Sequence, residues 1–189
     1  MQRNPRRRQC LQLGAALASV GAGQWLAPCA QGEPADPETE TQRHLSLRNL
    51  HTGEALDLDY RSGALCLPDA MTKIARVLRD YRTGEQHEID CGLLDILGDV
   101  AAALHADPVF DVISGYRSAQ TNELLRSQSS GVALRSLHME GRAIDVRLAG
   151  VDCSDLAAAA LTLGRGGVGY YRRSNFVHLD TGLARSWQG

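Results

Sequence analysis

Aromatic side chains are scarce in this sequence. Phe, Trp and Tyr make up 5% of the 189 residues, so we do not expect a surface that stacks many bases or sugars on rings. An excess of basic residues is also missing, because the chain has 20 Lys and Arg against 22 Asp and Glu. Four of the arginines fall within the first eight residues, and the rest of the chain is acidic on balance. This charge pattern excludes the basic footprint that is typical of a nucleic-acid-binding domain.

The five cysteines contain no C-x-x-C pair, which excludes a zinc ribbon or a thioredoxin-type motif. Two of them, Cys10 and Cys29, lie in an N-terminal segment with the features of a targeting signal. The remaining three, Cys66, Cys91 and Cys153, allow at most one disulfide and one free thiol. We favour buried, unreactive thiols and keep one disulfide as the alternative.

A long hydrophobic run is absent as well. Residues 1–30 consist of an Arg-rich start, a weakly apolar stretch over 11–27 and a small residue after Pro28-Cys29, which is the order of an export signal. The glycines within that stretch make it a poor permanent membrane span. Residues 7–11 (RRQCL) resemble a twin-arginine signal, with a plain secretory signal as the alternative. Lipid attachment at Cys29 is less favoured, because Pro28 fits a lipoprotein box poorly.

Residues 31–42 are acidic, carry prolines and contain almost no large apolar side chain. Such a segment cannot bury enough surface to fold, so we expect a flexible tether there. Residues 43–189 then form one domain with no internal repeat. Its hydrophobic periodicity predicts the following elements: a β-hairpin over 45–60, helices over 68–80, 90–106, 118–126 and 152–163, and strands over 110–113, 142–148, 168–171 and 176–180. Helices and strands that do not alternate regularly indicate an α+β fold.

The most informative stretch is Ser136-x-His138-x-x-Gly141-x-Ala143-x-Asp145. It places a His at the end of a loop and an Asp inside the next strand.

A second His, His178, lies in a later strand together with Asp180, and residues two apart in a strand face the same way. Two imidazoles and one carboxylate suit a divalent zinc with a fourth position left for water. Zinc lowers the pKa of such a water towards ~7, as a hydrolase requires.

The other four histidines sit in turns, polar loops or at helix ends, and we interpret them as ordinary hydrogen-bonded residues: His44, His51, His87 and His105.

Several motifs together resemble one known family. The ordered set comprises L-x-L-x-N-x-H-T-G-E over 45–54, S-G-Y-R-S over 114–118 with T-N shortly after, S-x-H-x-x-G-x-A-x-D over 136–145, and H-x-D over 178–180. In this order, across residues 43–187, they resemble the MepK-like murein endopeptidases within the zinc D-Ala-D-Ala carboxypeptidase and Hedgehog superfamily. The resemblance implies a small antiparallel sheet packed with helices.

The resemblance also implies roles for individual residues. His138, Asp145 and His178 would bind one zinc ion, and Arg117 would point its guanidinium at the substrate carbonyl or the oxyanion. Tyr116 and Ser136 are candidates for substrate binding, with core packing and a turn role as their respective alternatives.

One position departs from the superfamily pattern. Many members carry the general base three residues before the last His, where this chain has Asn175. An amide cannot accept a proton at neutral pH. We therefore expect Asp180 either to act as the base or to brace His178, with Glu140 as a weaker candidate for the base.

Taken together, the resemblance implies an exported, periplasmic zinc peptidase that hydrolyses peptide cross-links of peptidoglycan, as an endopeptidase. The alternatives are a D-Ala-D-Ala carboxypeptidase or dipeptidase, and a metal-containing cell-wall binding module without turnover, which Asn175 favours. Manganese or cobalt would fit the same ligands.

Overall fold

The structure is a computed structural model that describes residues 41–129 and 131–189. The expected export signal over 1–30 lies outside the described residues, as does the expected tether up to residue 40. The tether was expected to run to residue 42, but Gln42 already belongs to the first strand. Within the described part of the chain, no helix has the length and apolar character needed to cross a membrane.

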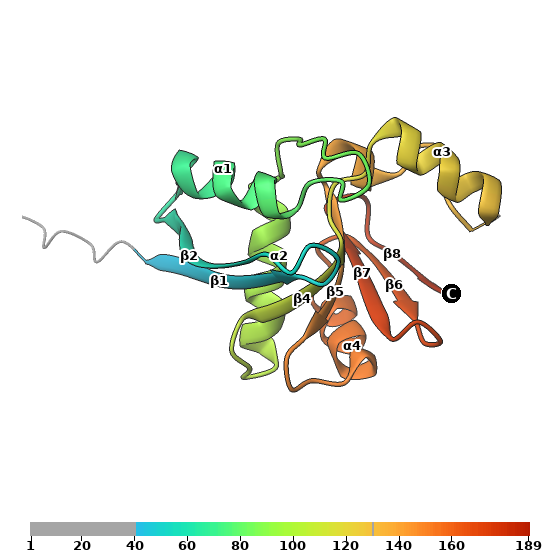
Figure 1. The fold of residues 1–189 in the computed structure, drawn as a ribbon. Coiled ribbons are helices and arrows are strands. Elements are labelled where there is room, and N and C mark those ends of the chain that lie inside the picture. The colour runs from blue at the N-terminus through green and yellow to red at the C-terminus, as the bar shows by residue number, and fades with distance from the viewer. Residues whose placement is uncertain (1–40, 130) are drawn as a thin grey trace, which may run out of the picture. The chain divides into compact units, whose positions relative to one another are not determined.

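The described residues contain one sheet of eight strands in the order β3-β2-β1-β4-β5-β7-β6-β8 (Figure 1). Its strands are β1 (Gln42–Asn49), β2 (Ala55–Ser62), β3 (Leu65–Cys66), β4 (Val109–Ser114), β5 (Ala143–Leu148), β6 (Gly167–Tyr171), β7 (Phe176–Asp180) and β8 (Arg185–Gln188).

Four α-helices and one 3-10 helix accompany the sheet: α1 (Pro68–Val77), α2 (Cys91–Ala103), α3 (Ala119–Gln128), η1 (Leu137–Glu140) and α4 (Cys153–Leu163). Local sequence explains where they begin and end. Pro68 starts α1, where its missing N–H costs nothing. The side chains of Asp90 and Ser118 cap α2 and α3 by accepting backbone N–H groups. Gly164 ends α4 in the left-handed conformation.

The two faces of the sheet carry different residues. α1 lies against β1 and β2, α2 against β1, β5 and β7, and α4 against β5, β6 and β7. Alternate residues of the strands, such as Val177 and Leu179, belong to this hydrophobic core. The residues between them, including His178 and Asp180, point to the opposite face because side chains alternate along a strand. The core therefore fixes which face receives the polar side chains.

The mixed helix-and-strand architecture was predicted correctly, whereas the sheet differs from the expected small antiparallel one. It is mixed, because β1 pairs with β4 and β6 pairs with β8 in parallel. The sequence analysis missed β3 and β8, which have two and four residues and too little alternation to form a pattern. Their pairing depends on neighbouring strands instead.

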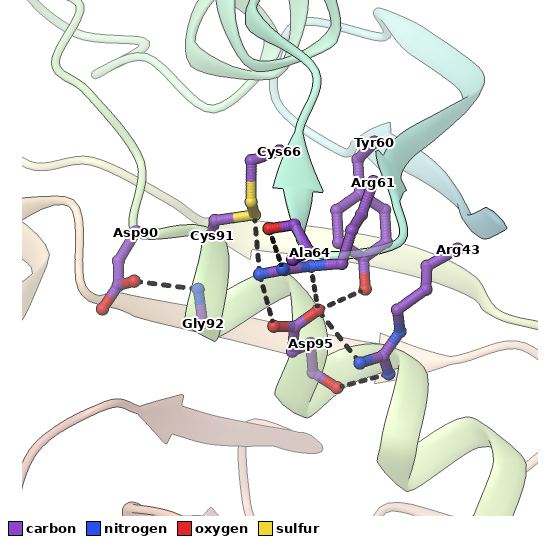
Figure 2. Close-up of a disulfide and its surroundings, with 9 residues drawn as sticks. All are labelled: Arg43, Tyr60, Arg61, Ala64, Cys66, Asp90, Cys91, Gly92 and Asp95. Carbon is purple, nitrogen blue, oxygen red and sulfur yellow. Dashed lines mark hydrogen bonds and ion pairs between the residues drawn. A yellow bond between two sulfur atoms is a disulfide. The ribbon is translucent and has the colours of Figure 1, made fainter. Parts of the chain in front are cut away.

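A disulfide joins Cys66 in β3 to Cys91 at the start of α2 (Figure 2). This corrects the preference for free thiols, because the fold brings together two residues 25 apart in the sequence. Closing a loop of that length stabilises a fold by about 3 kcal/mol in the chain-entropy account. Cys153 remains a buried free thiol.

Candidate metal centre

His138 is the second residue of η1, a single turn of 3-10 helix that ends at Gly141. Gly141 adopts a left-handed conformation with φ 64°, and a Cβ there would lie 1.9 Å from the Glu88 carbonyl oxygen. Only glycine fits this position. The glycine of the motif thus lets the chain turn from His138 into β5.

The tautomer of His138 is set by its surroundings. Its Nδ1 lies 2.7 Å from the carbonyl oxygen of Gly115. A carbonyl only accepts, so Nδ1 carries the proton and donates it, which leaves the lone pair on Nε2. Fixing one ring nitrogen so that the other is free is typical of metal-binding histidines.

Asp145 and His178 are neighbours across the sheet. β5 pairs antiparallel with β7 and places these two residues opposite each other. The distance between Asp145 Oδ1 and His178 Nδ1 is 2.9 Å. Both residues are buried.

Asp180 sets the tautomer of His178. Its Oδ2 lies 3.0 Å from His178 Nε2, so Nε2 donates and the lone pair of neutral His178 is on Nδ1. Asp180 also accepts bonds from the backbone N–H groups of Gly167 and Gly182 and from both terminal guanidinium nitrogens of Arg185. With five donors around it, this carboxylate is fully hydrogen-bonded.

With both histidines neutral, three lone pairs therefore converge. Nε2 of His138 lies 3.2 Å from Nδ1 of His178 and 3.4 Å from Oδ1 of Asp145. A tetrahedral zinc site with bonds of about 2.0–2.1 Å has ligand atoms about 3.3 Å apart. The group thus fits the size and the chemistry of a single divalent ion.

The pKa values of the three residues shift in different directions. Burial lowers the pKa of His138, which favours the neutral ligand form. Burial alone would raise the pKa of Asp145, but its contacts with His138 and His178 hold the pKa well below its ordinary value. For His178, burial opposes charge, yet the bonds to Asp145 and Asp180 raise the pKa. The carboxylates thus favour a positive charge between them.

Arg117 lies beside this group. The distance between its Nη2 and Asp145 Oδ2 is 3.8 Å, and its side chain is 12% exposed. Burial lowers the pKa of Arg117, but arginine remains charged in proteins. Its Nε is buried and has no hydrogen-bond partner among the described residues. The guanidinium thus keeps donor capacity at the metal group.

A buried carboxylate holds the turn that carries Arg117. Asp80 accepts bonds from the backbone N–H and the hydroxyl of Ser118 at 2.9 and 2.7 Å. On the other side, the backbone N–H of Arg117 donates to the His138 carbonyl at 3.1 Å. The turn therefore connects the loop after α1 to the metal group. Asp80 was not predicted from the sequence.

A cavity of about 410 Å³ opens beside the metal group, which is a usual size for a ligand site. It is lined by Arg117, Ser136, His138, Asp145, His178 and Asp180 together with residues of β6, β7, β8 and the segment before η1.

The sequence analysis missed Trp187 and Arg185 of β8, which complete this wall. The Trp187 ring lies 5.1 Å from that of His178 and occupies the space above Gly169, where a Cβ would meet the indole at 2.5 Å. The glycines within residues 164–169 were the one sequence feature that could have indicated a large side chain packed against this strand.

The remaining predicted residues occupy different places. Ser136 lines the cavity and precedes η1 without capping it. Tyr116 does not line the cavity, because its ring stacks on His87 with centroids 5.0 Å apart. Glu140 pairs with Arg142 and is likewise outside the lining. Asn175 has a φ of 53° in the turn before β7, a conformation that asparagine tolerates better than most residues.

The other histidines have ordinary contacts. His44 lies between Asp57 and Asp59 of β2, His51 stacks on Tyr81, and His105 ends α2 with a positive φ.

A mixed sheet with α1, α2 and α4 on one face and a buried His–Asp–His group beside a cavity on the other defines a metallopeptidase-type centre. The comparison with known families then identifies the particular group. The family model described as "Peptidoglycan L,D-endopeptidase MepK" matches residues 37–187 of this chain. The chain belongs to this family of M15 metallopeptidases.

Individual relatives agree. The peptidoglycan L,D-endopeptidase MepK of Escherichia coli K12 is 41% identical over 172 residues, which cover 91% of this chain and 93% of that protein. The probable peptidoglycan L,D-endopeptidase MepK of Haemophilus influenzae is 41% identical over 152 residues, covering 80% and 82%. No solved structure gives a significant match.

Proposed function

We propose that this protein is a zinc-dependent endopeptidase that hydrolyses peptide cross-links of murein between diaminopimelate residues. The observation that carries the proposal is the convergence of three potential ligand atoms, on His138, Asp145 and His178, beside an open cavity. Membership of the MepK family and the names of its relatives support the substrate. We also propose that this chain has the fold of the superfamily that includes D-Ala-D-Ala carboxypeptidases and Hedgehog domains.

His138 Nε2, Asp145 Oδ1 and His178 Nδ1 are the proposed ligands. A zinc ion held by them would supply Lewis acidity for polarising the scissile carbonyl and activating water. Gly115 holds His138 and Asp180 holds His178, each through the ring nitrogen that does not face the metal. The protein thus presents its ligands preoriented.

In this proposal Asp180 orients His178 through a hydrogen bond and does not act as the general base. It is 1% exposed and accepts five hydrogen bonds. These bonds hold the pKa of Asp180 well below its ordinary value, against the effect of burial, which would raise it. A carboxylate so stabilised as an anion is a poor proton acceptor.

Arg117 positions the substrate carbonyl and stabilises the negative charge that develops on its oxygen. Its buried, incompletely hydrogen-bonded guanidinium is available for this bond, and a donor already in place costs no reorganisation when charge develops. Ser136 lies at the rim as a further contact for the substrate backbone. Tyr116 acts indirectly, by packing the turn that holds Arg117.

The proposed location is the periplasm. This location is based on the proposed cell-wall substrate and on the twin-arginine-type signal expected in residues 1–30. Lipid attachment at Cys29 is the less favoured alternative.

The function is tested with muropeptides. We expect the zinc-loaded protein to release monomers from muropeptides cross-linked through diaminopimelate and to leave monomeric pentapeptides intact. His138→Ala should abolish this release, whereas the surface variant His44→Ala should not. Removal of terminal D-Ala from monomers would instead indicate a carboxypeptidase. Binding to sacculi without any product would indicate a binding module.

A further inference from the structure

Among the side chains that line the cavity, positive charges outnumber negative ones. Three arginines and two carboxylates line it: Arg117, Arg135, Arg185, Asp145 and Asp180. A divalent ion at the metal group would add two further positive charges. The cavity therefore favours ligands that carry negative charge.

Two of the three arginines have carboxylate partners. Arg185 lies 2.7 Å from Asp180 Oδ2, and Arg117 lies 3.8 Å from Asp145 Oδ2. Arg135 is exposed, and no ion pair or hydrogen bond to its guanidinium occurs within residues 41–129 and 131–189. It is thus the lining cation whose charge the described protein does not compensate.

The backbone around Arg135 is held on both sides. Before it, the buried side chain of Asn122 in α3 donates to the carbonyl of Ala133 at 3.2 Å. After it, the carbonyl of Ser136 accepts the N–H of Met139 at 2.9 Å as η1 begins. These contacts fix the backbone on both sides of an arginine that lies at the cavity wall three residues before His138. A fixed backbone reduces part of the entropy that a charged contact with a ligand would cost.

The proposed substrate supplies a matching anion. When the amine of one diaminopimelate centre forms the scissile amide, the carboxylate on the same carbon stays free. That negative charge is next to the bond that is cut, and arginine is well suited to bind a carboxylate through two parallel N–H groups.

We propose that Arg135 determines specificity by binding the free carboxylate on the amine side of the scissile bond. This inference rests on the proposed function. It predicts that the enzyme distinguishes a cross-link with a free carboxylate from one in which the same group is a carboxamide. Arg117 remains responsible for the scissile carbonyl, so the two arginines contact different groups of the substrate.

The test compares two synthetic cross-linked peptides that differ only in carboxylate against carboxamide. The full zinc-loaded chain should cleave the carboxylate form with a kcat/KM about ten-fold higher, the size of one hydrogen bond between charged groups. Arg135→Ala should bring the ratio to about one, mainly through KM, and leave cleavage of the carboxamide unchanged. Arg173→Ala, which removes an exposed arginine outside the lining, should keep the ratio.

Two further measurements distinguish a failure of the role proposed for Arg135 from a failure of the proposed function. Asn122→Ala should reduce the ratio without removing the cation. In the His178→Ala background, which does not turn over substrate, the carboxylate peptide should bind about ten-fold more tightly than the carboxamide only while Arg135 is present. A ratio that persists in Arg135→Ala, or that Arg173→Ala lowers equally, would overturn the role of Arg135. If the parent cleaves neither peptide, the proposed function fails, and the binding ratio still decides the role of Arg135.

Discussion

Two buried carboxylates in this protein have opposite surroundings. Asp95 in α2 is surrounded by donors, since Arg43, Arg61 and the Tyr60 hydroxyl all bond to it at 2.8–3.1 Å (Figure 2). Asp145, on the other face of the sheet, lies next to two imidazole nitrogens whose neutral forms present lone pairs. The Asp95 cluster is satisfied by the protein itself, whereas the Asp145 cluster has more acceptors than donors.

This difference separates a structural cluster from a functional one. Buried polar groups are normally paired because an unpaired group costs stability. A buried carboxylate that faces two imidazole nitrogens of potential ligands is therefore explained best by a ligand that supplies positive charge. Changes to the Asp145 cluster should affect metal binding and activity, and changes to the Asp95 cluster should affect stability alone.

The largest expected effect comes from Asp145→Asn. The amide keeps the shape but loses the anionic ligand, so we expect loss of zinc and at least a ~10³-fold fall in kcat/KM, because a metal contributes several kcal/mol to the transition state. Elemental analysis and cleavage of cross-linked muropeptides measure the two effects. Zinc content equal to that of the parent would contradict the assignment of this ligand.

Arg117→Ala should lower kcat by about 10²-fold while zinc content stays unchanged. The reason is the loss of a donor to the developing oxyanion, for which factors of this order are typical. Arg126→Ala on α3, where the arginine pairs with Glu123 at the surface, is the matched control. An effect on KM alone would assign Arg117 to substrate binding instead.

Asp95→Ala should destabilise the fold by about 3 kcal/mol. It removes the carboxylate that pairs with both Arg43 and Arg61 in a partly buried site, and breaking one side of such a network is costly. Denaturant unfolding measures the change. Zinc content should remain at the parent level; a loss of zinc in a folded Asp95→Ala protein would contradict the separation of the two clusters.

The smallest expected effect concerns pH and Asp80. Burial alone would raise the pKa of Asp80, but hydrogen bonds from Thr121, Ser118 and Arg82 lower it to about 2. Because the pKa is depressed in the folded state, the stabilisation is present above pH ~4 and is lost as the pH falls towards 2, by about 2 kcal/mol in total.

Asp80→Asn should remove this part of the pH dependence and lower stability at neutral pH. Unfolding followed between pH 5 and 2 measures it. An equal slope in the parent and in the variant would show that Asp80 does not contribute through its charge.

Local patterns account for what the sequence predicted. The alternation of residues 45–60 predicted the β1–β2 hairpin, and the apolar periodicity of residues 90–106 predicted α2. The H-x-D spacing placed His178 and Asp180 on one face, because it depends only on strand geometry. The proximity of His138 and Asp145 to His178 required the resemblance to a known family as well.

Contacts between distant residues could not be predicted in this way. The pairing of Cys66 with Cys91, the contact of Asp80 with Ser118 and the position of Trp187 over the site all depend on how strands and loops meet in three dimensions. The saturation of Asp180 by donors is equally non-local, since it involves Gly167 and Arg185. The spacing of residues along the sequence does not predict such contacts.

Zinc titration by calorimetry tests the central claim most directly. The metal-free parent should bind one zinc ion per chain, Asp95→Ala should bind it with equal affinity, and His178→Ala should bind it at least ~100-fold more weakly. Tight binding of one zinc by His178→Ala, or no binding by the parent, would contradict the account.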